Sequence, residues 1–157
     1  MKIKEKKTQT FRAGVGAVIV NKNGLVLGFE RKDFPNKWQF PQGGLNEDED
    51  LLKAVKREIY EETGIKANDI KLLAEAPFPT VYEFPEERKN KRAGHRGQVH
   101  RWFLFRLESS DETITLGDQK EFCAWKWTSM DDMIESIVSF KKPVYQELKN
   151  CFEAYLG

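Results

Sequence analysis

Three glutamates, Glu58, Glu61 and Glu62, stand at spacings of three and four residues along the chain. On an α-helix these spacings put the side chains on neighbouring parts of one surface, where the carboxylates repel one another unless a cation holds them. Hard divalent cations such as Mg²⁺ prefer oxygen ligands of this kind. The cluster therefore predicts a divalent metal site, and a solvated charged helix surface is the alternative interpretation.

The helical phase of the surrounding segment separates these two interpretations. At about 100° per residue, one apolar stripe is formed by Leu51, Leu52, Val55 and Ile59. Glu58 and Glu62 lie at the edge of this stripe, whereas the basic residues of the helix lie on its far side. Carboxylates that face inward without a basic neighbour need another partner, because an unpaired buried charge is costly. Geometry thus favours a metal ion over a purely structural role.

Both ends of this helix carry sequence signals. Asn46 or Asp48 can cap its start, and Gly64 stands where a left-handed C-terminal residue is expected. Gly43 and Gly44 precede the helix. We interpret this pair as a tight turn that lets a carbonyl oxygen approach a ligand or an ion closely.

Together these residues resemble the signature box of the Nudix hydrolases. The box fixes nine positions, and all are present: Gly43, Glu49, Arg57, Glu58, Ile59, Glu61, Glu62, Gly64 and Ile65. The resemblance implies that Glu58, Glu61 and Glu62, with the carbonyl group of Gly43, bind a divalent metal. Mg²⁺ is the expected ion, and Mn²⁺ can substitute for it.

The same resemblance implies the fold and the supporting residues. Glu49 and Arg57 would orient the metal ligands through charge-assisted hydrogen bonds. The implied fold is of the α/β class, an α/β/α sandwich with a mixed β-sheet. Relatives commonly have Pro-Gly just before the first glutamate of the box, where this chain has Glu47 and Asp48.

Nudix enzymes hydrolyse a phosphoanhydride in a nucleoside diphosphate that is linked to another group. Bound metal ions neutralise the phosphate charge and activate a water molecule for such a reaction. The sequence has no GxxxxGK[ST] element, so metal rather than a P-loop would hold the phosphates.

A general base would help this reaction. Glu121, in the sequence EFCAWKW, is the candidate, because it starts an expected strand and can lean over the metal helix. From the residues alone, an exposed glutamate in a turn is the simpler interpretation. Glu58 and Glu61 complete the set of candidate catalytic residues.

Further segments resemble the bacterial RNA pyrophosphohydrolase branch of the family. They are Phe11-Arg12, WQFPQGG at residues 38–44, Gln98, Trp102-Phe103-Leu104, EFCAWKW, and VSFKKPVY at residues 138–145. This resemblance implies an enzyme that removes pyrophosphate from 5′-triphosphorylated RNA, leaves a 5′-monophosphate and so promotes mRNA decay. Enzymes of this branch also hydrolyse dinucleoside polyphosphates.

The branch implies a role for each matching residue. Glu121 would act near the catalytic water, and Arg31 and Lys32 would bind phosphate or base. Arg12 and Gln98 would belong to the same substrate surface. A surface for the nucleobase would be contributed by Val138, Ser139, Phe140 and Lys141. Core packing of the ring and ordinary solvation of the lysine are the alternatives.

Composition predicts one domain, residues 1–157, with residues 1–10 as a flexible N-terminus. The net charge of +1 gives no global attraction to polyanions, so RNA or nucleotide binding requires local patches. Cys123 and Cys151 lack the spacing of a disulfide framework or a zinc site, which indicates reduced thiols. We find no signal peptide and no apolar run of membrane length. We therefore expect a cytoplasmic protein without a membrane partner, and a homodimer is compatible with the family.

Hydrophobic alternation predicts strands at residues 14–20 and 25–30, joined by a hairpin at residues 21–24. Further strands are expected at residues 38–40, 70–76, 81–84, 99–107 and 122–128. Two more helices are expected at residues 131–138 and 144–156. This order predicts a mixed sheet between helices.

Residues 86–101 form a stretch rich in basic side chains: Arg88, Lys89, Lys91, Arg92, Arg96 and Arg101. We expect a solvated loop, and guidance of RNA toward the site is the functional alternative. His95 and His100 lack metal-ligand spacing, so we leave them out of the site.

Three functions follow from these observations. The first is an RNA pyrophosphohydrolase, and the second is a hydrolase of dinucleoside polyphosphates or nucleoside triphosphates that uses the same metal site. The third is an inactive RNA or nucleotide binder on a Nudix scaffold. The three intact glutamates argue against the third function.

Overall fold

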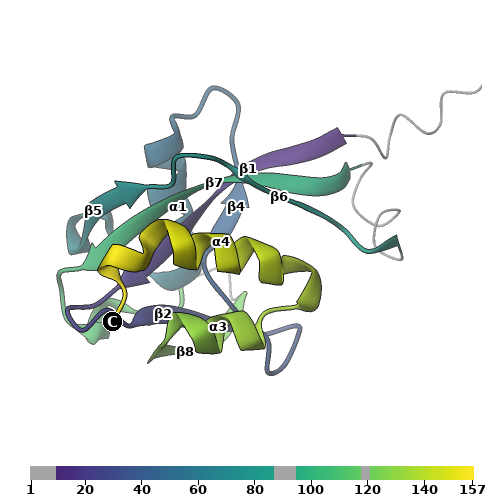
Figure 1. The fold of residues 1–157 in the computed structure, drawn as a ribbon. Coiled ribbons are helices and arrows are strands. Elements are labelled where there is room, and N and C mark those ends of the chain that lie inside the picture. The colour runs from purple at the N-terminus through teal and green to yellow at the C-terminus, as the bar shows by residue number, and fades with distance from the viewer. Residues whose placement is uncertain (1–9, 87–94, 118–120) are drawn as a thin grey trace, which may run out of the picture.

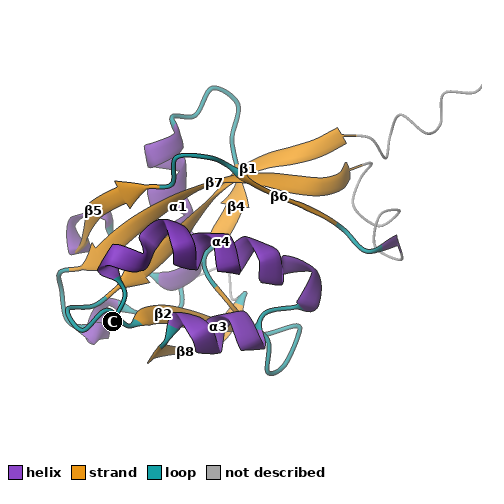
Figure 2. Cartoon of the chain, viewed as in Figure 1, coloured by secondary structure: helices purple, strands orange, loops and turns teal. Residues whose placement is uncertain are grey.

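The computed structural model describes residues 10–86, 95–117 and 121–157. Its strands are β1 (Thr10–Val20), β2 (Val26–Arg31), β3 (Trp38–Gln39), β4 (Gln42–Gly44), β5 (Ile70–Glu75), β6 (Thr80–Glu83), β7 (His95–Leu107) and β8 (Phe122–Thr128). Its α-helices are α1 (Leu51–Thr63), α3 (Met130–Ser136) and α4 (Lys142–Phe152). Figures 1 and 2 show the strands as one twisted sheet with helices on both of its faces.

The sheet is mixed because β1 pairs in both directions. β1 is parallel to β7 along its whole length and antiparallel to β2 and β4. The order of the main path is β3-β2-β1-β7-β5, while β8 pairs with β2 and β6 pairs with β7. The expected α/β fold with a mixed sheet between helices is confirmed.

The strand pattern explains why helices cover both faces. Alternate residues of a strand point to opposite faces, and in β1 both sets are apolar. Val15, Ala17 and Ile19 are buried with residues of α1, whereas Val18 and Val20 are buried with residues of α3 and α4. Two hydrophobic cores result, and from Gly14 to Val20 both faces of β1 are buried, whereas Thr10, Arg12 and Ala13 are exposed.

Most expected elements are present, with shifted ends. The hairpin between β1 and β2 is confirmed by the Val20–Val26 pair. The sequence predicted a tight turn at Gly43 and Gly44. In the structure these residues instead belong to the short strand β4, which pairs with β1. Helices α3 and α4 each begin earlier than expected, at Met130 and Lys142.

The basic stretch at residues 86–101 is not one loop. β7 begins at His95 rather than at residue 99, so the second half of this stretch is strand. In that half, Arg96 pairs with Glu83 and Arg101 pairs with Glu75, each across neighbouring strands. Arg88, Lys89, Lys91 and Arg92 lie outside the described residues, so RNA guidance by them stays a prediction.

The expected flexible N-terminus also lies outside the described residues, except for Thr10, which begins β1. Cys123 and Cys151 are both free thiols. Within the described part of the chain, no helix is long and apolar enough to cross a membrane.

Candidate active site

Helix α1 carries the glutamate cluster and is fixed at both ends. The backbone N–H of Lys53 donates to the carboxylate of Asp50 at 3.1 Å, so Asp50 is the N-cap, and the prediction of Asn46 or Asp48 is wrong. Gly64 ends the helix with φ of 81°, as expected. Asp48 instead adopts a left-handed φ of 58°.

The glutamates of the cluster differ in burial. Glu62 is only 2% exposed, and its Oε2 atom has no hydrogen-bond partner among the described residues. Burial is the main cause that raises the pKa of Glu62 well above its ordinary value, and the nearby carboxylates of Glu121 and Glu58 raise it further. Burial also raises the pKa of Glu58. Charge is therefore concentrated here without a fixed counterion for Glu62.

Arg57 connects the other carboxylates. Its guanidinium donates to Glu49 at 2.7 and 2.9 Å, to Glu58 at 2.8 Å and to Glu61 at 3.3 Å. It also donates to the carbonyl oxygen of Gly44 at 3.0 Å. Helical phase placed this arginine on the far side of the helix, and that inference is wrong because the long side chain reaches back along the surface. These contacts place Arg57 and Glu49 beside the glutamates, and the orienting role that the family resemblance implied for them stays a prediction.

Gly43 is placed against the cluster by strand β4. A Cβ atom added to Gly43 would overlap the carboxylate of Glu58, so only glycine allows this approach. The carbonyl oxygen of Gly43 in turn lies directly over Gly14 of β1, where a Cβ would also overlap. Two glycines on paired strands thus bring the backbone to the glutamates.

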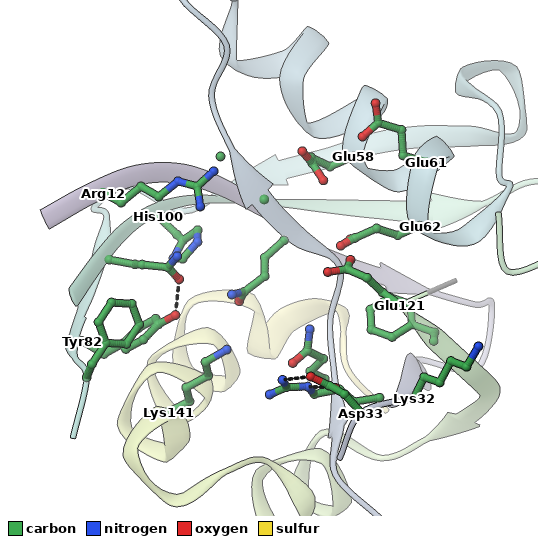
Figure 3. A pocket seen from close by; sticks show the side chains of 18 of the residues that line it. Arg12, Lys32, Asp33, Glu58, Glu61, Glu62, Tyr82, His100, Glu121 and Lys141 are labelled. Carbon is green, nitrogen blue, oxygen red and sulfur yellow. Dashed lines mark hydrogen bonds and ion pairs between the residues drawn. The ribbon is translucent and has the colours of Figure 1, made fainter. Parts of the chain in front are cut away.

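Glu121 reaches the site through strand pairing. β8 pairs with the end of β2, and the backbone N–H of Lys32 donates to the carbonyl oxygen of Glu121 at 2.9 Å. Figure 3 shows the carboxylates of Glu121 and Glu62 pointing toward one another. We call Glu58, Glu61, Glu62 and Glu121 the acidic half of the site.

All four carboxylates line a cleft of about 750 Å³. In Figure 3 the opposite side of this cleft is formed by Arg12, Tyr82, His100 and Lys141. Gln98, which accepts the hydroxyl hydrogen bond of Tyr82, also lines the cleft, and we call these five residues the basic half. The guanidinium of Arg12 lies over Gly44, where no Cβ would fit. Lys141 is 7% exposed, with its ammonium 5.3 Å from the ring centroid of Tyr82. In Figure 3 the four glutamates thus lie across the cleft from Arg12 and Lys141, while Lys32 lies on the side of Glu121.

Most of the substrate residues expected from the sequence line this cleft: Arg12, Arg31, Lys32, Gln98, Phe140 and Lys141. The other two do not. Val138 is 6% exposed and packs in the core beneath α4, and Ser139 is exposed outside the lining. Arg31 is held by Asp33 through two hydrogen bonds of 3.1 and 3.0 Å at the cleft edge.

Sequence reasoning missed several residues of the lining: Asp33, Gln39, Gln42, Tyr82 and His100. The exclusion of His100 from the site is the main error. His100 and Gln98 are two residues apart on β7, so they share one face of the strand. Tyr82 pairs with Gln98 in the neighbouring strand. Strand periodicity applied to Gln98 identifies His100, and the pairing of β6 with β7 identifies Tyr82, whereas metal-ligand spacing identifies neither.

The chemistry of the acidic half fits a divalent cation. Among the described residues no group of three His, Cys, Asp or Glu side chains is already arranged to hold a metal ion, and Arg57 pairs with Glu58 and Glu61. The donors are nevertheless of the right kind, since the buried Oε2 atom of Glu62 lacks a partner and the approach at Gly43 is kept open.

Comparison with known proteins finds a matching family model and several similar proteins. The NUDIX domain model matches residues 10–148. The Nudix hydrolase 26, chloroplastic, of Arabidopsis thaliana is 41% identical over 97% of this chain and 74% of its own length. The RNA pyrophosphohydrolase of Cereibacter sphaeroides is 39% identical over 96% of this chain and 95% of its own.

Solved structures agree on the fold. The dihydroneopterin triphosphate pyrophosphohydrolase of E. coli superposes with a TM-score of 0.71 at 21% identity, over 88% of this chain and 97% of that one. The Ap4A hydrolase of C. elegans superposes with a TM-score of 0.67 at 19% identity, over 91% and 98%. At these identities the likeness concerns the fold alone.

Proposed function

The chain belongs to the Nudix hydrolase family, and on this premise we propose that it is a metal-dependent RNA pyrophosphohydrolase. In this proposal it hydrolyses the 5′-triphosphate end of RNA to a 5′-monophosphate, and so promotes mRNA decay in the cytoplasm. Bacterial relatives that carry this name match nearly the whole chain, which supports the proposal. The oligomeric state stays a prediction.

One observation carries the proposal, namely that an acidic half and a basic half face each other across a single cleft. A polyphosphate is the class of substrate that needs both. Its reacting phosphorus must lie beside the metal, while its remaining negative charge needs cationic donors. Arg12 and Lys141 are such donors, and they lie apart from the glutamates.

The acidic half would hold the metal. Glu58, Glu61 and Glu62, with the carbonyl group of Gly43, would ligate Mg²⁺, for which Mn²⁺ could substitute. Such an ion, when bound, supplies Lewis acidity and lowers the pKa of coordinated water. Glu49 and Arg57 would keep the ligands oriented.

Glu121 is the proposed general base. Its carboxylate points toward that of Glu62, while its backbone carbonyl accepts a hydrogen bond from the backbone N–H of Lys32. A carboxylate in this position can accept a proton from an attacking water molecule without moving the strand that carries it.

The remaining cleft residues would bind the RNA. Arg31 and Lys32 would contact phosphate or base, and Phe140 would offer a ring for stacking beside Lys141. Val138 and Ser139, which do not line the cleft, would act only by shaping the short turn Ser139–Lys141.

The test compares substrate classes with the full-length protein. We expect Mg²⁺-dependent release of pyrophosphate or phosphate from 5′-triphosphorylated RNA, and Glu62→Gln should nearly abolish it. Diadenosine polyphosphates and nucleoside triphosphates are assayed side by side. If the wild-type protein leaves triphosphorylated RNA intact but cleaves diadenosine polyphosphates, the RNA hypothesis is wrong and the second function holds. Loss of all cleavage with retained RNA binding would support the inactive scaffold.

A further inference from the structure

The walls of the cleft contain unusual buried polar atoms. Five buried side-chain nitrogen or oxygen atoms of the described residues have no hydrogen-bond partner, and three of them belong to cleft residues: Gln39 Oε1, Glu62 Oε2 and His100 Nδ1. Buried polar groups without partners are rare in folded proteins and need an explanation. The metal accounts for Glu62, at the acidic half. His100 lies at the other side and is not explained by the metal.

The ring of His100 is held in place by packing. It is 2% exposed, and its plane is stacked on Tyr82 at a centroid distance of 6.0 Å and an angle of 13°. A Cβ atom on Gly14 would lie 3.0 Å from His100 Cδ2 and 3.1 Å from Nε2, so a glycine makes room for this edge of the ring. Trp102 packs against it at 6.0 Å. The ring is therefore fixed in orientation by contacts that satisfy none of its polar atoms.

The charged groups that act on His100 are cations, while the carbonyl oxygen of Gly43 lies near the same Gly14 position as its Nε2 edge. Arg12 and Lys141 are the charged residues whose fields act on it, and burial together with these two cations lowers the pKa of His100 to about 3. The ring is thus neutral and retains one N–H donor. Gln98 accepts the hydroxyl hydrogen bond of Tyr82 through Oε1, which leaves its NH₂ group as a further donor.

A set of donors between two cations is complementary to an oxyanion. A nucleobase edge presents donors as well as acceptors, whereas the outer oxygens of a phosphate only accept. The acidic lining residues that Figure 3 labels, namely Asp33, Glu58, Glu61, Glu62 and Glu121, all lie on the other side of the cleft. The basic half is therefore suited to phosphate.

We propose that His100 is a specificity-determining residue whose ring N–H donates to an outer oxygen of the terminal phosphate of the substrate, held between Arg12 and Lys141. This inference rests on the proposed function and deepens it, since it assigns the phosphate farthest from the nucleoside to the basic half. A 5′-triphosphate spans from the acidic half to His100. A 5′-diphosphate is one phosphate shorter, so the hydrogen bond from His100 should strengthen its binding less than that of a 5′-triphosphate.

The first test needs no variant. The chain has two histidines, His95 and His100, so nuclear magnetic resonance of ¹⁵N-labelled rings gives one pair of ring-nitrogen signals for each of them in the untagged protein. His95 forms a hydrogen bond with the hydroxyl group of Thr10, where β1 and β7 begin, and serves as the internal reference. We expect inorganic tripolyphosphate to shift the His100 ring nitrogens and to leave those of His95 in place. An unmoved His100 signal at saturating tripolyphosphate overturns the inference.

The second test uses a matched pair of variants. His100→Phe keeps a flat ring beside Tyr82 and loses the donor, while His100→Gln keeps a donor. Calorimetric titration with tripolyphosphate should show binding at least tenfold weaker in His100→Phe, with partial recovery in His100→Gln. In turnover, KM for triphosphorylated RNA should rise more than KM for diphosphorylated RNA. A change in preference for the first nucleobase, with equal effects on both phosphate lengths, would contradict the inference.

The two proposals fail separately. If wild-type protein cleaves triphosphorylated RNA but His100→Phe binds tripolyphosphate as tightly as wild type, the function stands and the role of His100 is rejected. If RNA is not cleaved, the tripolyphosphate titration still decides whether the basic half is a phosphate site.

Discussion

Arg57 and Glu49 form a two-point ion pair, with Nε to Oε2 at 2.7 Å and Nη2 to Oε1 at 2.9 Å. The same guanidinium continues to Glu58 and Glu61. The guanidinium of Arg57 thus connects Glu49, in the loop before α1, to the proposed metal ligands Glu58 and Glu61. A lysine ammonium cannot reproduce this forked geometry.

We predict that Arg57→Lys lowers kcat/KM by about 10- to 100-fold, because the ligands lose their orientation. Titration of activity with Mg²⁺ should show weaker metal affinity in the variant. Lys56→Arg, on the next position of the helix, serves as the control and should behave like wild type. Unchanged metal affinity in Arg57→Lys would show that the guanidinium does not orient the ligands.

Glu62→Gln should lower the activity but raise the stability of the metal-free protein. The folded-state pKa of Glu62 is raised, so its charged form at neutral pH opposes folding, and a neutral amide removes that cost. In EDTA we expect the variant to be more stable by about 1 to 3 kcal/mol in urea unfolding. Mg²⁺ should stabilise wild type and not the variant. Glu147→Gln, exposed on α4, is the control that should change neither value.

Glu121→Gln should reduce kcat by about 100-fold or more while the fold is retained. The reason is that the strand pairing with Lys32 uses the backbone of Glu121 and not its carboxylate. Single-turnover rates on triphosphorylated RNA measure the effect. A rate near that of wild type would remove Glu121 from the mechanism.

Asp48→Gly should stabilise the protein by about 0.5 to 1 kcal/mol. Asp48 has a φ of 58°, a left-handed conformation that costs less for glycine than for a residue with a side chain. Glu47→Gly is the matched control, since Glu47 is equally exposed and is not among the residues with positive φ. It should be destabilised, because glycine there only increases the entropy of the unfolded chain. Urea unfolding of both variants decides the comparison.

His100 should make the wild-type protein sensitive to mild acid. Its pKa is lowered from 6.5 to about 3 on folding, so between these values the unfolded chain binds a proton that the folded chain does not. Its contribution to stability is therefore present above pH 6.5 and lost as the pH falls. Between pH 8 and pH 5, His100→Phe should lose about 2 kcal/mol less stability than wild type. If both proteins lose the same stability between pH 8 and pH 5, then His100 is not the group whose protonation destabilises the fold.

The acidic half could be predicted because it is nearly continuous in the sequence. Glu58, Glu61 and Glu62 share one helix, so local periodicity and the spacing of the box were enough to identify them. The position of Glu121 depends on the pairing of β8 with β2. Its role came from family resemblance and not from local geometry.

The basic half could be predicted only in part. Its residues come from β1, β6, β7 and the turn before α4, and no local spacing links them. His100 was excluded because it was judged as a metal ligand, although its strand register with Gln98 carried the relevant information. Gly43 and Gly44 likewise read locally as a turn, and only pairing with β1 makes them a strand.

The parallel pairing of β1 with β7 has a consequence for the order of folding. Thr10 pairs with His95 and Val20 with Arg106, so the two central strands are joined only after the intervening chain is available. Contacts between such distant segments form slowly compared with helices and hairpins. Helix α1 can therefore form before the basic half of the cleft is in place. Glu58, Glu61 and Glu62 then lie on a helix that does not yet border a cleft. The cleft is complete only after the segments that follow β7 have also been added, because Glu121 precedes β8 and Lys141 precedes α4.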